Sequence, residues 1–254
     1  VIPTEAGIVV YLYPFRKIIE INPEQKTARV EAGARWSDID ILAKKQGLSL
    51  MTYPSRKFST VAGWIATGGY SINSFRYGHL SKQILSMTVV TASGEAKPLP
   101  PADKEFAYYI STEGIFGIIA EVTLTLRPTP PASFSHLLYF ENAYVAFNFI
   151  DNFVNSKEKE NISVNVIRFL DENHMSDSNE VMHDNVFKKS PAVLIELGSA
   201  DDDEKFVTFL SQQANIDEAP SYVASFLWNE RLFGAKAKRL GPSILTSETI
   251  IPID

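Results

Sequence analysis

The stretch that decides the fold is Thr60-Val61-Ala62-Gly63-Trp64-Ile65-Ala66-Thr67-Gly68-Gly69-Tyr70-Ser71. Its glycine and alanine residues let the backbone approach a ligand closely, and glycine permits consecutive N–H groups to converge on an anion. A buried diphosphate requires such donors, because a desolvated charge without hydrogen bonds is costly. The alternative is a helix that packs tightly through its small residues and ends in a Gly-Gly turn. The residues alone do not decide between the two.

The segment before this stretch predicts strands and one helix. Gly7 to Leu12 (GIVVYL) has the composition of a buried strand, and Ile18 to Ile21 that of a second. Lys26 to Glu31 alternates as a half-buried strand does. Ser37 is the expected N-cap of a helix that Gly47 ends.

The segment after it predicts a hairpin, a short helix and a further strand. The expected strands are Ile84 to Thr91, its hairpin partner Lys97 to Leu99, and Ala120 to Leu126, whose apolar residues alternate with polar ones. A short helix is expected at Asp103 to Ile110. Three prolines in Arg127 to Pro131 interrupt regular structure, so we place a domain boundary there.

The remainder predicts a second, α+β domain, because strands alternate with helices in it. Strands are expected near His136 to Phe140, Ser163 to Phe169, Ala192 to Leu197 and Ile244 to Ile250, and helices near Ala143 to Asn155, Asp201 to Ala214 and Ala224 to Lys238. The acidic run Asp201 to Glu204 is interpreted as a helix N-terminus, where negative charge is favourable. The predicted domains are residues 1–130 and 131–254.

Composition excludes several classes of function. The 254 residues carry a net charge of −6, which disfavours non-specific binding to nucleic acid. No apolar run approaches the roughly 18 residues that cross a membrane. With no cysteine and only scattered histidines, no metal site is expected. The absence of cysteine and of a secretory signal favours a cytoplasmic location, with peripheral attachment to a membrane as the alternative.

The order of these elements resembles the FAD-binding domain of the vanillyl-alcohol-oxidase family, also called the para-cresol-methylhydroxylase (PCMH) type. In that family an extended proline segment leads into a T/S-V-G/A-G-x-x-A-T-G-G loop, followed by Y-G and by a strand that ends in a small acidic hairpin. Here Pro54-Ser55, Thr60 to Gly69, Tyr77-Gly78 and Val89 to Glu95 match in that order. Gly114 to Val122 (GIFGIIAEV) is similar to the family's G-x-x-G-I-I-T-E strand.

The resemblance implies FAD as cofactor and assigns flavin-contact positions residue by residue. These are Ser55, Thr60, Gly63, Thr67, Gly68, Gly69, Tyr70 and Ile118 or Ile119. Ala62 departs from the commoner Gly-Gly pair. Trp64 is bulky for its place, so we expect its side chain to face the core. The resemblance assigns no catalytic residue in this chain.

The resemblance also implies that parts of the family's machinery lie outside this chain. The family's first glycine-rich loop, which wraps the pyrophosphate, precedes the Gly7 strand, and Val1-Ile2-Pro3 corresponds to the residues just after it. We therefore expect a PCMH-type domain that holds its second subdomain and part of the first. Part of an α+β cap with an antiparallel sheet follows, and it resembles glycolate-oxidase-like and D-lactate-dehydrogenase-like members more weakly. The family's base and carboxylate-binding arginines lie largely beyond the last residue.

The implied activity is hydride transfer from a small D-2-hydroxy acid, such as lactate or glycolate, to flavin. The alternative is a non-catalytic flavin-domain subunit that scaffolds an oxidoreductase complex. Expected partners are a small-molecule substrate, an electron acceptor or partner subunit, and a second copy of the chain. Charge-assisted hydrogen bonds contribute roughly 1.5–3 kcal/mol each. Losing two with the first loop predicts that this chain alone binds FAD on the order of a hundredfold more weakly and does not turn over.

Overall fold

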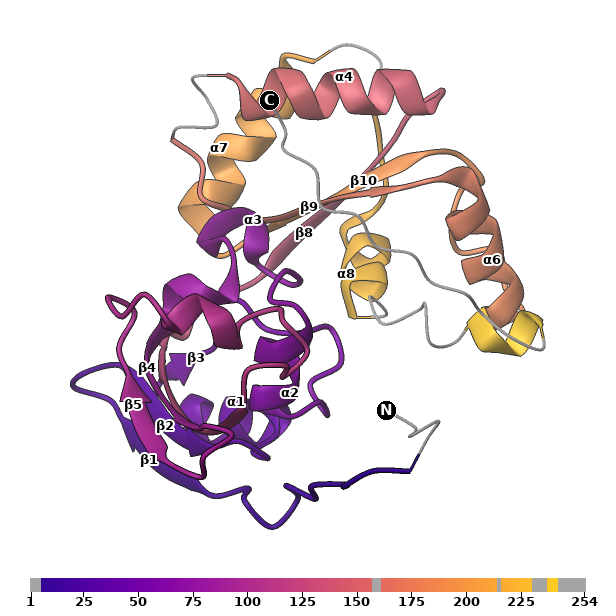
Figure 1. The fold of residues 1–254 in the computed structure, drawn as a ribbon. Helices are drawn as coiled ribbons and strands as arrows, with labels where there is room; N and C mark the ends of the chain where they lie inside the picture. The colour runs from indigo at the N-terminus through magenta and orange to yellow at the C-terminus, as the bar shows by residue number, and fades with distance from the viewer. Residues whose placement is uncertain (1–5, 157–160, 214–215, 230–236, 242–254) are drawn as a thin grey trace. The chain divides into compact units, whose positions relative to one another are not determined.

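The computed structural model describes residues 6–156, 161–213, 216–229 and 237–241 (Figure 1). The chain divides into two compact units, Val1–Pro131 and Ala132–Asp254. Each unit combines helices with an antiparallel sheet, so the predicted α+β class is confirmed.

The first unit is built on a five-stranded antiparallel sheet with the order β1-β2-β6-β4-β5. Its strands are β1 (Ile18–Asn22), β2 (Thr27–Glu31), β4 (Ile84–Val90), β5 (Ala96–Leu99) and β6 (Ile118–Thr125). All five were predicted. The apolar positions Val122 and Leu124 of β6 are buried, which confirms the alternation in the sequence.

Short helices cover this sheet and make the core of the unit. They are α1 (Trp36–Lys45), α2 (Val61–Thr67), α3 (Ser74–Tyr77) and the 3-10 turns η1 (Leu80–Gln83) and η2 (Phe106–Tyr109). The helix expected at Asp103 to Ile110 is thus a single 3-10 turn. Trp36 and Ile39 of α1 and Ile65 of α2 are fully buried in one apolar cluster with the sheet.

The strand predicted at Gly7 to Leu12 is wrong. These residues form no strand, and Ile8 is 95% exposed. A buried strand needs a neighbour that pairs its backbone and covers its side chains. In the part of the chain that the structure describes, no strand takes that place.

The N-cap predicted at Ser37 is also wrong, because α1 begins at Trp36 with Arg35 as its cap residue. The N–H of Trp36 donates to Ser59 O at 3.3 Å and that of Ser37 to Lys57 O at 2.8 Å. The segment around residues 57–59 therefore satisfies the start of the helix, and no capping side chain is needed.

The proline-rich connector contributes a short edge strand. Residues Arg127–Pro128 (β7) pair antiparallel with β3 (Leu48–Ser49). Proline is tolerated here because an edge strand leaves one side of its backbone unpaired.

The second unit holds a four-stranded antiparallel sheet in the order β11-β8-β10-β9. Its strands are β8 (Phe134–Tyr139), β9 (Val164–Leu170), β10 (Ala192–Leu197) and β11 (Asp217–Glu218). Its helices are α4 (Ala143–Val154), α6 (Glu172–Met182), α7 (Ala200–Ser211) and α8 (Ser221–Asn229), and a 3-10 turn, η3, spans Ala237–Leu240.

Three strands and the helices α4, α7 and α8 of this unit were predicted, whereas α6 and β11 were not. Helix α6 escaped notice because its buried face includes polar residues. Asn179 is buried there, and its amide bonds both the N–H and the carbonyl of Phe187, at 2.9 and 2.7 Å. The strand expected at Ile244 to Ile250 lies outside the described residues.

Candidate cofactor site

The first turn of α2 is held by protein groups rather than left open to a ligand. The N–H of Val61 donates to Ala34 O at 2.9 Å and that of Ala62 to Ala32 O at 3.1 Å. The hydroxyl of the N-cap Thr60 accepts from the N–H of Gly63 at 3.2 Å. Of the two alternatives left open for this stretch, an anion-binding concavity and a packed helix, the structure shows the packed helix at this end.

The other end of α2 is joined to the second predicted segment. Ser111 N–H donates to Ile65 O at 2.9 Å, and Glu113 N–H donates to Ala66 O at 2.7 Å. The Ser111 hydroxyl donates to Gly68 O at 2.9 Å. These bonds satisfy the last carbonyls of the helix, which have no partner within it. The two motifs that the sequence singled out thus lie against each other.

A cavity of about 200 Å³ opens where they meet. Its lining is mostly apolar and consists of Leu12, Ala62, Gly63, Ala66, Tyr109, Gly114, Gly117, Ile118 and Ile119. Pockets for whole drug-sized ligands span roughly 300–1,000 Å³. The cavity therefore has room for one ring system of a dinucleotide, and its small-residue wall leaves that room open.

Gly117 is required for the loop to enter β6 at the edge of this cavity. Its φ is +149°, and a Cβ there would lie 2.6 Å from Val90 O. Any larger residue would force the loop away from the strand beside it, because that backbone region is open to glycine alone.

The Gly68-Gly69-Tyr70 turn presents two backbone donors. The carbonyl of Gly68 accepts from Ser111, and that of Gly69 accepts from Leu80 N–H at 2.9 Å. In a planar trans peptide the N–H points opposite to the C=O. The N–H groups of Gly69 and Tyr70 therefore point away from these partners, and within the described part of the chain neither donates to another group. Unpaired donors in this place fit a ligand rich in acceptors.

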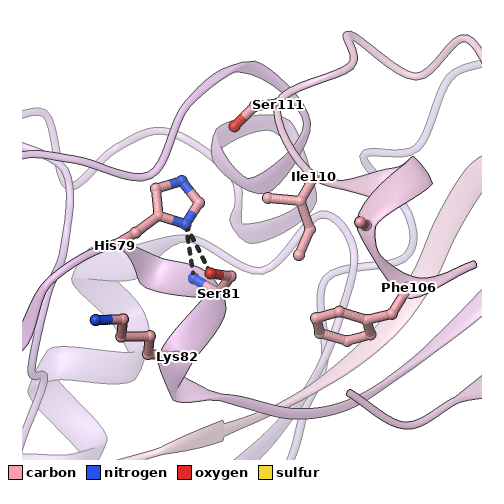
Figure 2. Close-up of a pocket in the computed structure, with 7 residues that line it drawn as sticks. His79, Ser81, Lys82, Phe106, Ile110 and Ser111 are labelled. Atoms are coloured by element: carbon pink, nitrogen blue, oxygen red, sulfur yellow. Dashed lines mark hydrogen bonds between the residues drawn. The ribbon is translucent and has the colours of Figure 1, made fainter. Parts of the chain in front are cut away.

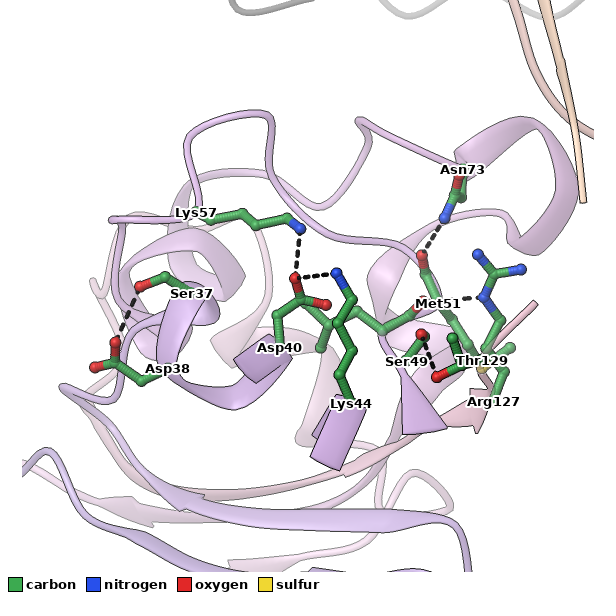
Figure 3. A network of polar contacts seen from close by, with 11 residues as sticks. Ser37, Asp38, Asp40, Lys44, Ser49, Met51, Lys57, Asn73, Arg127 and Thr129 are labelled. Carbon is green, nitrogen blue, oxygen red and sulfur yellow. Dashed lines mark hydrogen bonds and ion pairs between the residues drawn. The ribbon is translucent and has the colours of Figure 1, made fainter. Parts of the chain in front are cut away.

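A polar network fixes the proline segment that carries Ser55 (Figure 3). Asn73 donates to Met51 O at 2.9 Å, and Arg127 donates to Leu50 O at 3.1 Å. The carboxylate of Asp40, which is 8% exposed, pairs with Lys57 at 2.7 Å. These contacts hold the proline segment close to the Gly68-Gly69-Tyr70 turn.

Ser55 itself is tied directly to the residue that follows Tyr70. Its N–H donates to Ser71 Oγ at 3.1 Å, and its own side chain is exposed.

The structure brings some of the predicted contact residues together and separates others. Gly63, Ile118 and Ile119 line the cavity. The other six do not: Ser55, Thr60, Thr67, Gly68, Gly69 and Tyr70. Thr67 turns its hydroxyl to Gly63 O at 2.9 Å. Trp64 packs edge-on against Trp36 at 5.3 Å, so the expectation that it faces the core is confirmed.

His79 is a site residue that the sequence analysis missed, because histidines were considered only as metal ligands. Its ring lies 4.8 Å from that of Tyr70, centroid to centroid. It borders a second cavity, of about 410 Å³, lined also by Ser81, Lys82, Phe106, Ala107, Ile110 and Ser111 (Figure 2). Burial lowers the pKa of His79, the backbone of Gly68 raises it, and the charge of Lys82 lowers it. The sequence signal that could have identified His79 as a site residue is its position directly after the Tyr77-Gly78 motif.

Two arginines flank the turn that brings Leu12 to the first cavity. The guanidinium carbons of Arg16 and Arg35 lie 4.3 and 5.9 Å from the centroid of the Tyr13 ring. Both side chains are exposed, and neither has a carboxylate partner among the described residues. Arg35 also forms a backbone bridge with Thr60. This pair supplies positive charge beside the start of α2.

Two further properties bear on the kind of site. Within the described ranges, no group of histidine, aspartate and glutamate side chains is arranged to hold a metal ion. None of the helices that the structure describes has the length and apolar character needed to cross a bilayer.

Comparison with known proteins identifies the class. Residues 1–99 match the family described as FAD binding domain. Residues 1–99 are thus similar to an FAD-binding domain, which agrees with the resemblance found in the sequence and supports FAD as the cofactor. A solved structure of alkyldihydroxyacetonephosphate synthase shares the fold, with a TM-score of 0.70 and 22% identity over 89% of this chain and 46% of that one.

Individual relatives carry different names. D-lactate dehydrogenase of Anaerostipes hadrus is 32% identical over 143 residues, 54% of this chain and 30% of the relative. Glycolate oxidase subunit GlcD of Escherichia coli is 28% identical over 148 residues, 56% of this chain and 30% of the relative. Alkyldihydroxyacetonephosphate synthase of Trypanosoma brucei brucei is 32% identical over 140 residues, 52% of this chain and 23% of the relative. The matched regions thus make up less than a third of these curated relatives.

Proposed function

We propose that the protein is an FAD-linked oxidoreductase that removes hydride from a small D-2-hydroxy acid such as lactate or glycolate. The observation that carries the proposal is the meeting of α2 with the residue 114–119 loop around an apolar cavity, together with two unpaired backbone donors in the turn that follows α2. The names of the D-lactate dehydrogenase and glycolate oxidase relatives support the substrate class. When bound, FAD supplies the acceptor for the hydride.

Different residues of the first unit bind different parts of the cofactor. The cavity lined by Gly63, Ile118 and Ile119 encloses an apolar ring. The N–H groups of Gly69 and Tyr70 donate to acceptor atoms of the cofactor. Ser55, Thr60, Thr67 and Gly68 complete the contact surface around the turn.

We assign the binding of the negative diphosphate of FAD to the arginine pair, because the N–H groups at the start of α2 already donate to protein oxygens. Arg16 and Arg35 carry charge without carboxylate partners in the described part of the chain. Guanidinium groups suit phosphate oxygens, to which they donate in a planar fork.

One observation favours the second candidate function, a flavin-domain subunit that scaffolds a complex without turnover. Within the described part of the chain, Tyr109 is the one titratable side chain that lines the first cavity. A base that takes the hydroxyl proton of the substrate has to come from elsewhere. A partner subunit or an electron acceptor belongs to both proposals, since the glycolate oxidase relative is named as a subunit. We also propose a homodimer and a cytoplasmic location.

The test is a titration of the full chain with FAD, followed by assays of D-lactate and glycolate with an artificial acceptor. Ala66→Leu fills the wall of the cavity with a good helix former, so it should weaken FAD binding about tenfold or more while the fold persists. Ala143→Leu, at an exposed helical position of the second unit, is the matched control. Equal FAD affinity in the two variants would overturn the proposed site. Turnover of either acid would exclude the scaffold.

A further inference from the structure

We propose that His79 is a positioning residue for the cofactor. Its imidazole fixes the Gly68-Gly69 peptide so that the N–H groups of Gly69 and Tyr70 remain aimed at FAD. This inference rests on the proposed function, since it concerns how the first unit presents donors to that cofactor.

The contacts of the ring define its tautomer. The N–H of Ser81 can only donate, and it lies 3.1 Å from His79 Nδ1 (Figure 2). Nδ1 therefore accepts, and the ring proton sits on Nε2. The Ser81 hydroxyl lies 2.8 Å from the same Nδ1 and fixes the ring plane. His79 also caps the first turn of η1 through Nδ1, so the ring is anchored on its own side of the turn.

The opposite edge of the ring reaches the turn. The Nε2 edge of the ring lies against the Gly68-Gly69 peptide, because a Cβ built on Gly69 would collide with it, and the Gly68 backbone raises the pKa of His79. The Gly68 carbonyl accepts from the Ser111 hydroxyl. The Ser111 hydroxyl and the imidazole, from separate segments, thus hold the Gly68-Gly69 peptide, to which the N–H of Gly69 belongs. Removing the imidazole frees this peptide to rotate, which would turn that N–H away from the cofactor.

Packing holds the next residue in the same way. A Cβ on Gly69 would lie 2.8 Å from His79 Cε1 and 2.9 Å from Cδ2, so the ring closes against the glycine. The Tyr70 ring also packs against the imidazole, with 60° between the two ring planes. The imidazole therefore restrains the turn by packing against both Gly69 and Tyr70.

The arrangement works only with neutral imidazole, which makes FAD binding sensitive to acid. The titratable groups that face the ring are Lys82 from η1 and Tyr70 from the turn, while the residue 106–111 segment adds none to the cavity lining. A second proton would place Nδ1–H against the Ser81 N–H and a positive charge beside Lys82. Burial lowers the pKa of His79 below the ordinary value of about 6.5, so binding should weaken below that pH and stay constant above it.

The experiment measures FAD affinity of the full chain by flavin absorbance from about pH 7.5 down to about pH 5. We expect His79→Ala to bind FAD about tenfold more weakly at neutral pH. His79→Gln keeps a donor near the Nε2 position and cannot titrate. It should stay within about threefold of the unmodified chain and lose the acid dependence. His183→Asn, at an exposed position with φ of 56° that asparagine tolerates, is the control.

A second readout needs no cofactor. Hydrogen exchange of the residue 68–71 amides in the cofactor-free chain should quicken in His79→Ala and return towards normal in His79→Gln. If His79→Ala binds FAD as tightly as the unmodified chain with the same pH profile, the inference alone is overturned. If the unmodified chain binds no FAD at any pH, the proposed function falls and the inference with it.

Discussion

Two adjacent glycines are expected to respond in opposite ways to the same substitution. Gly68 has an extended φ of −173°, and a Cβ there would meet Trp64 Nε1 at 3.7 Å, an ordinary van der Waals contact. Gly69 has a φ of +144°, and a Cβ there would collide with the His79 ring. The two positions are neighbours in the sequence, with Gly68 half-buried and Gly69 buried, so they form a close pair for comparison.

The magnitudes follow from these environments. Gly68→Ala should leave the free energy of unfolding within about 0.5 kcal/mol, or raise it slightly by restricting the unfolded chain. Gly69→Ala imposes a left-handed backbone on a residue with a Cβ and displaces an anchored imidazole, at a cost of about 1–3 kcal/mol. Each kcal/mol corresponds to a shift of roughly 2–8 °C in Tm for domains of such sizes.

The assay is denaturant unfolding of the full chain and both variants, with FAD affinity measured in parallel. Gly68→Val should weaken FAD binding while the unfolding curve remains close to that of the unmodified chain, because the clash is with the cofactor. Equal losses of stability in Gly68→Ala and Gly69→Ala would refute the account of the turn.

Two further predictions concern charge. Arg16→Gln combined with Arg35→Gln should weaken FAD binding about tenfold and flatten its dependence on salt, as measured by titration at low and high ionic strength; an unchanged salt dependence would argue against the arginine pair. His136 lies between Asp203 and Glu218 at 2.7 and 2.6 Å. His136→Leu should lower the unfolding free energy by about 1–3 kcal/mol, discounted for the partial exposure of both carboxylates. Calorimetry of the full chain checks this, and an unaltered transition would contradict it.

The elements that the sequence predicted correctly are those whose pattern is local. Strand β6 alternates apolar and polar residues because one face packs on the core, and that period is visible without any partner. The Gly7 to Leu12 run shows the limit of this reasoning. Its composition suits a buried strand, but burial depends on a neighbouring strand that the described chain does not supply. Helix α6 was missed for the converse reason, since Asn179 makes a polar side chain part of the interior.

The same distinction applies to the site. The order of motifs predicted that α2 and the residue 114–119 loop belong to one cofactor site, and the structure places them around one cavity. Which backbone donors are free could not be predicted from the motif. The carbonyls of Ala32 and Ala34, far upstream, use the first donors of α2. His79 escaped for a similar reason, because its role depends on Ser81 and Gly68 meeting the two sides of one ring.

The central claim is that the first unit holds FAD through the cavity, the turn and the arginine pair. Parallel absorbance titrations of the full chain with FAD and with FMN test it most directly. FMN lacks the diphosphate and the second nucleotide, so the account predicts saturable binding of FAD, even if weak, and at least about tenfold weaker binding of FMN. FMN bound as tightly as FAD, or no saturable binding of either flavin, would contradict the account.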